Sequence, residues 1–147
     1  MSKADKKQRQ KAKRKAKQHE ARRRESASPV KRLAEARGEF QCWISDKFEE
    51  FNQLEIFVHK RGAGMVGMAA FLIDRGVVGL KDAWTRMNVD EREFLDIIKS
   101  CRDRGIPMRK ANLEEARHWV AGSARWANDH GMRLPKDWTK TALLIGG

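Results

Sequence analysis

The first 24 residues constrain the fold most strongly, because they cannot contribute to a hydrophobic core. From Ser2 to Glu25 no aliphatic side chain is larger than alanine. Residues 1–24 hold twelve Lys or Arg against two acidic residues, and so carry most of the chain's net charge of +12. A segment of this composition cannot bury a face. We therefore expect residues 1–28 to form a basic arm that is disordered alone in water.

The cations of this arm are the strongest functional signal in the chain. About one cation for every two residues is typical of arms that bind nucleic acid, and the alternative is a merely solubilising tail. Such arms neutralise phosphates without reading sequence. Ala, Lys, Arg and Gln are good helix formers, so phosphate binding would also favour a helix. The arm lacks the Trp, Phe or Leu face of a membrane-surface helix, so we expect no membrane partner. The predicted nucleic-acid-binding residues are Lys3, Lys6, Lys7, Arg9, Lys11, Lys13, Arg14, Lys15, Lys17, Arg22, Arg23 and Arg24.

The rest of the chain, residues 29–147, reads as a single domain. Ser26–Pro29 predicts a break after the arm, followed by a short helix that stops at Gly38. Alternating apolar residues predict strands near 40–45, 54–60 and 64–74, and residues 46–53 suit a helical turn. In the second of these, His59 is expected to point outward, and Arg61–Gly64 suits a hairpin turn. Gly67 within the third strand suggests a close backbone approach or a bulge.

The second half of the chain predicts helices. Asp90 and Asn112 each precede an apolar helical stripe as capping residues, and Gly105 and Gly131 end the two stripes. A short helix is expected to begin at Pro135. Strands followed by helices predict an α+β fold, in which a small antiparallel sheet precedes a helical half.

The segment 71–84, FLIDRGVVGLKDAW, is the best candidate for a catalytic centre. Asp74 follows a buried strand, and an Asp beside Lys81 and Asp82 would suit a site with shifted pKa values. The structural alternative is stronger, because Asp often closes a strand and GLKDAW would open a helix. GVVG does not match a phosphate-binding glycine loop.

Metal and cofactor sites have little support, and we expect no cofactor. Cys42 and Cys101 lack metal-ligand spacing, and two isolated cysteines do not predict a disulfide framework. Glu114, Glu115 and His118 share a helical face, but a solvated turn explains them better. Five tryptophans are mostly core residues by type. About two at the surface would stack on unpaired bases, with Arg117–Trp119 and Arg125–Trp126 as candidates.

The body also carries motifs that resemble an uncharacterised bacterial protein family. The similar segments are FLID (71–74), VGLKDA (78–83), EEARHWVAGSARWA (114–127) and GMRLPKDW (131–138). Residue 77 or 78 is Val where this family often has Cys, and Lys136 stands where it has His after the proline. If that His is functional in the family, its absence here argues against enzymatic activity. The resemblance covers residues 40–147 and implies no particular activity, because none is established for the family.

Together these features predict a non-enzymatic, cytoplasmic RNA-binding protein. We expect it to be ribosome-associated, with the body docked on RNA or a neighbouring ribosomal protein while the arm follows phosphates. One alternative is a sequence-nonspecific DNA-binding protein, since no helix-turn-helix pair is evident. The other is a nucleic-acid enzyme centred on Asp74, Lys81 and Asp82.

Overall fold

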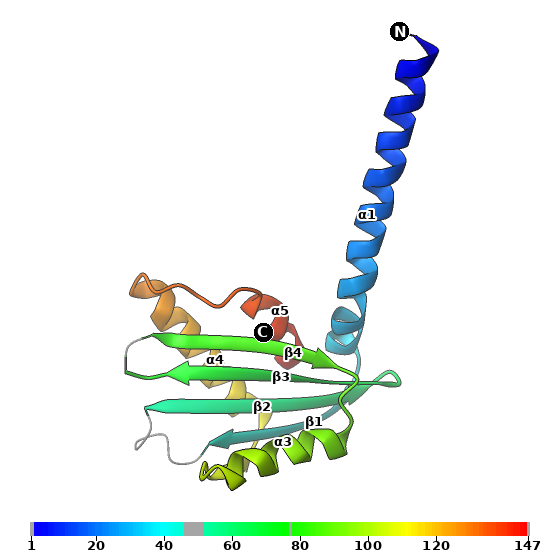
Figure 1. The fold of residues 1–147 in the computed structure, drawn as a ribbon. Coiled ribbons are helices and arrows are strands. Elements are labelled where there is room, and N and C mark those ends of the chain that lie inside the picture. The colour runs from blue at the N-terminus through cyan, green and yellow to red at the C-terminus, as the bar shows by residue number, and fades with distance from the viewer. Residues whose placement is uncertain (1, 46–51, 77, 147) are drawn as a thin grey trace.

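A computed structural model describes residues 2–45, 52–76 and 78–146, and the side chains of all of these except residues 19–28 (Figure 1). Its architecture is a long N-terminal helix, a five-stranded antiparallel sheet and shorter helices. The predicted helical turn within 46–53 falls mostly outside the described residues. The elements are α1 (Lys3–Glu35), β1 (Gly38–Ser45), β2 (Gln53–Gly62), β3 (Met65–Asp74), β4 (Gly79–Met87), α3 (Glu91–Asp103), β5 (Met108–Ala111), α4 (Leu113–Asp129), α5 (Trp138–Ala142) and the 3₁₀ helix η1 (Leu143–Ile145).

The sheet forms the middle layer of the body and has strand order β4-β3-β2-β1-β5. Helix α3 packs on one face, and α4, α5 and η1 pack on the other (Figure 1). Each face has its own core. The larger one includes Ile56, Phe71 and Leu80, and the smaller one is built around Phe57 and Phe94. The α+β fold and the first three strands are confirmed.

Strand β4 corrects one prediction, and strand β5 was not foreseen. The segment GLKDAW was expected to open a helix, but it is the first part of β4, paired antiparallel with β3. Its buried residues Leu80 and Ala83 belong to the larger core. A register irregularity between Leu72 and Ile73 interrupts the simple alternation that would have predicted a strand. Strand β5 has four residues, too few to show a pattern.

Helix α1 corrects a second prediction, because the basic arm is an ordered helix rather than a disordered segment. Ser2 caps its N-terminus and accepts a hydrogen bond from the Asp5 backbone N–H. The arm is rich in strong helix formers. At the other end Val30 and Leu33 are buried in the larger core. The predicted break at Ser26–Pro29 is wrong: Pro29 lies inside the helix, where good helix formers on one side and tertiary packing on the other outweigh its usual cost.

The two capped helices are confirmed. The Asp90 side chain accepts from the Glu93 backbone N–H at 2.8 Å, which starts α3. The Asn112 side chain accepts from the Glu115 N–H at 2.9 Å, which starts α4. The short C-terminal helix begins at Trp138, three residues later than expected. These caps therefore fix where the helices begin on either side of β5.

The turn between β2 and β3 contains a strained residue. Ala63 has a φ of 51°, and Gly64 follows at 72°.

 Both turn residues are therefore in the left-handed region, as in a type I′ hairpin turn, where a side chain with a Cβ is disfavoured.

Replacing Ala63 with glycine is therefore expected to raise the free energy of unfolding by about 1 kcal/mol. The reason is that glycine adopts this conformation without the steric cost of a Cβ. Urea denaturation of the two proteins measures the difference. A matched Ala12→Gly variant in α1 should change the stability of the body little, since Ala12 is exposed and far from the core. A destabilised Ala63→Gly protein would contradict the prediction.

Candidate nucleic-acid interface

The basic arm stands clear of the body along most of its length (Figure 1). The side chains of Ser2 to Gln18 are all exposed. At 100° per residue, the cations of this stretch cover about two-thirds of the helix circumference. Ala12, Ala16 and Asp5 lie on the remaining third. The described cations are Lys3, Lys6, Lys7, Arg9, Lys11, Lys13, Arg14, Lys15 and Lys17; Arg22, Arg23 and Arg24 are also in α1, but their side chains are not described.

The arm joins the body through the last turns of α1. Leu33 is fully buried, and a Cβ added at Gly67 would come within 2.9 Å of its side chain. The close approach at Gly67 is therefore made by the side chains of Leu33 and Met87, rather than by another backbone segment as predicted. The Lys60 ammonium donates to the Ala34 carbonyl oxygen at 2.9 Å, near the C-terminal end of α1. The base of the arm is therefore fixed both by apolar packing and by a cation at the helix C-terminus.

The carboxylates of Asp74 and Asp82 both accept hydrogen bonds from nearby backbone N–H groups. The Asp74 carboxylate accepts from the Gly76 backbone N–H at 2.9 Å, which closes the turn after β3. The Asp82 carboxylate accepts from the N–H of the next residue, Ala83. Among the described residues no hydrogen bond or ion pair joins Asp74, Lys81 and Asp82 to one another. The hydrogen bonds of Asp74 and Asp82 are therefore local, to the turn after β3 and to β4.

Of the histidine and carboxylate candidates, His59 and Glu115 have partners within the fold, whereas Glu114 and His118 are exposed. His59 was predicted to point outward, but it is buried, because α3 covers this face of the sheet. Its Nε2 lies 2.7 Å from the Val89 carbonyl oxygen. Glu115 forms a two-pronged ion pair with Arg109, whose hydrogen bonds lower the pKa of the carboxyl. The described residues contain no group of three or more His, Cys, Asp or Glu that could hold a metal ion.

The cysteines are also poorly placed for chemistry. Burial raises the pKa of the Cys42 thiol to about 12 and also raises that of Cys101. The thiolate is the nucleophilic form, so both groups are poor nucleophiles near neutral pH.

The two tryptophans that were predicted to stack on bases, Trp119 and Trp126, already have neighbours within the protein. Trp126 is stacked on His130, with ring centroids 4.1 Å apart, and the Arg75 guanidinium lies over the Trp119 ring. Each ring therefore already has a neighbour on one side. Trp84, on the edge strand β4, is the most exposed, at 41%. Trp138 is half-buried and lines a groove. The residues next to it in the sequence did not predict this position.

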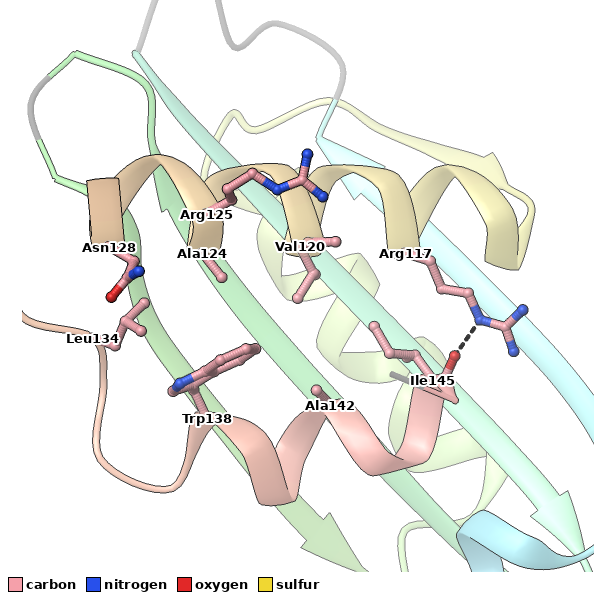
Figure 2. Close-up of a pocket in the computed structure, with 10 residues that line it drawn as sticks. Arg117, Val120, Ala124, Arg125, Asn128, Leu134, Trp138, Ala142 and Ile145 are labelled. Atoms are coloured by element: carbon pink, nitrogen blue, oxygen red, sulfur yellow. Dashed lines mark hydrogen bonds between the residues drawn. The ribbon is translucent and has the colours of Figure 1, made fainter. Parts of the chain in front are cut away.

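The groove lies between α4 and the C-terminal segment (Figure 2). It has a volume of about 460 Å³. Buried aliphatic side chains form its floor, Trp138 stands on one side, and arginines stand on the α4 side. Its lining residues are Arg117, Val120, Ala121, Ala124, Arg125, Asn128, Leu134, Trp138, Ala142 and Ile145.

None of the described helices is both long and apolar enough to cross a membrane. Comparison of the chain with models of protein families, with curated proteins and with solved structures gave no match. The resemblance noted in the sequence therefore stays a prediction.

Proposed function

We propose that this protein is a non-enzymatic RNA-binding protein, associated with the ribosome, and that α1 is its main RNA contact. The observation that carries the proposal is the exposed, cation-covered stretch of α1 from Lys3 to Lys17. The cations of this stretch repel one another along the helix. Phosphates of RNA would neutralise the charge and release counterions.

The distribution of charge around α1 favours RNA over duplex DNA. A helix that enters the DNA major groove reads bases with one face. The cations of α1 cover about two-thirds of the circumference. This arrangement suits a folded RNA whose phosphates approach from several sides, as in a ribosomal particle. A role as a sequence-nonspecific DNA-binding protein is the alternative that the same charges would serve.

Sedimentation of a cell lysate through a low-salt sucrose gradient tests this proposal. The full-length protein is expected to sediment with ribosomal particles, and a variant lacking residues 2–25 is expected to stay at the top. The deletion leaves Val30 and Leu33 in place, so the body keeps its core contacts. If the full-length protein remains at the top of the gradient, ribosome association is wrong.

Two matched variants separate charge from helix length. Replacing the nine described cations with glutamine keeps a helix of the same length but removes the charge, and should release the protein from the particles. Replacing the seven lysines among them with arginine keeps the charge and should retain association. Release by both variants would mean that the contact depends on lysine itself rather than on charge.

A further inference from the structure

The basic arm has no Phe, Trp or Tyr, so a base that stacks on one of these rings must lie against the body. We infer that the groove between α4 and α5 binds one unpaired RNA nucleotide, with its base against Trp138 and neighbouring phosphates at Arg117 and Arg125. The inference rests on the proposed function, because the arm supplies the affinity that brings RNA to the body. Figure 2 shows the arginines and Trp138 around the groove.

The arginines are spaced along one line of α4. Arg117, Ala121 and Arg125 are separated by four residues each, so they share a face of the helix. The Cα atoms of the two arginines are about 12 Å apart along the axis. Arg117 is held in place by a hydrogen bond from its Nε to the Ile145 carbonyl oxygen. Both arginines are exposed, and their guanidinium groups are therefore accessible to phosphate oxygens.

The interior of the groove suits a flat, largely apolar group. Val120, Ala124 and Ala142 are buried and present small or branched aliphatic surfaces. The Trp138 ring offers a stacking surface, and base–aromatic stacking contributes about 1–3 kcal/mol per base. Asn128 at one end carries an amide that can donate to and accept from a base edge. None of the described residues that line the groove is acidic.

Cations connect the arm to the groove. Helix α1 packs against η1, which also supplies Ile145 to the groove. Lys60 bonds to the end of α1, and its pKa is lowered by burial and by the positive charge of Arg117. Lys60 and Arg117 are therefore close enough to interact. A single RNA strand that leaves the arm would meet Arg117 first and then the groove.

The test compares single-stranded and duplex RNA, using the full-length protein in 50 mM salt. Fluorescence anisotropy measures the affinity for a labelled 12-nucleotide uridine strand and for a 12-base-pair RNA duplex. Trp138→Leu and Ala121→Leu should each weaken binding of the single strand by roughly 5- to 150-fold, the range that loss of one stacked base predicts. Binding of the duplex should change less than twofold, because neither variant alters charge.

Ala121→Leu protects the test against misfolding, since Ala121 is exposed on α4 and a leucine there narrows the groove without opening the core. Arg125→Glu should weaken binding of the single strand more than Arg92→Glu does. The Arg92→Glu variant makes the same charge change on α3. Arg92 lies across the sheet and does not line the groove.

The outcomes distinguish the two proposals. If the full-length protein binds neither RNA, the proposed function is wrong and the inference falls with it. If it binds both but the groove variants leave the ratio of the two affinities unchanged, only the inference is overturned. If these variants instead weaken binding of an acidic, leucine-containing peptide and spare the single strand, the groove is a protein-binding site.

Discussion

Raising the salt concentration from 50 to 200 mM is expected to weaken RNA binding by roughly 10³- to 10⁵-fold. Each phosphate neutralised by Lys or Arg releases condensed counterions, and this gain shrinks as the free salt concentration rises. The stretch from Lys3 to Lys17 alone presents nine exposed cations. Six to ten phosphate contacts would produce an effect of the predicted size.

The measurement is a titration of labelled RNA at several salt concentrations, read as the slope of log affinity against log salt. Replacing the nine cations with glutamine should flatten this slope strongly. Replacing Ala12 and Ala16 with glutamine changes the same helix without changing its charge, and should leave the slope as it is. A nearly flat slope for the unmodified protein would mean that the arm does not contact RNA.

The second large effect is expected at Gly79, where replacement by alanine should lower the free energy of unfolding by about 3 kcal/mol or more. Gly79 has a φ of 77°, which disfavours any side chain. An added Cβ would also lie 2.7 Å from the Ser123 carbonyl oxygen and 3.1 Å from the Trp126 ring. The backbone of α4 cannot move away without disturbing its packing on the sheet.

Thermal or urea unfolding measures this effect, with Gly122→Ala as the control. Gly122 lies within α4, and an added Cβ would meet nothing within 4 Å. That variant should therefore gain about 0.5–1 kcal/mol, as alanine does over glycine inside a helix. If Gly79→Ala unfolds at the same urea concentration as the unmodified protein, β4 and α4 do not meet as closely as described.

Local patterns predicted much of the body. Alternation gave the three strands, and the Asp90 and Asn112 caps gave the starts of α3 and α4. These signals come from residues within one helix or strand, so they can be interpreted without knowing which other element packs against it. The buried position of His59 could not be predicted in this way, since it depends on α3 crossing a face that an isolated strand would leave open.

The structures of the arm and of the candidate site depend on contacts between elements, which the sequence did not predict. Composition identified the cations, but it could not show that Val30 and Leu33 would anchor a helix through Pro29. The GLKDAW segment looked helical because its register irregularity hides the strand alternation. The groove forms where α4 lies beside Trp138, and no residue spacing within one segment of the sequence predicts that contact.

Helix α1 continues without interruption into the core, and this fixes the orientation of the arm about its own axis. Because Leu33 is buried against the sheet and the helix continues to Lys3, the direction of each cation from Lys3 to Lys17 is fixed relative to the body. Each residue advances that direction by about 100°. A flexible tether would limit only the distance between a bound ligand and the body, whereas a continuous helix also fixes the orientation of the ligand. The arm and the groove would then hold one RNA in a single relative orientation, and the entropy of aligning the two contacts is settled when the protein folds.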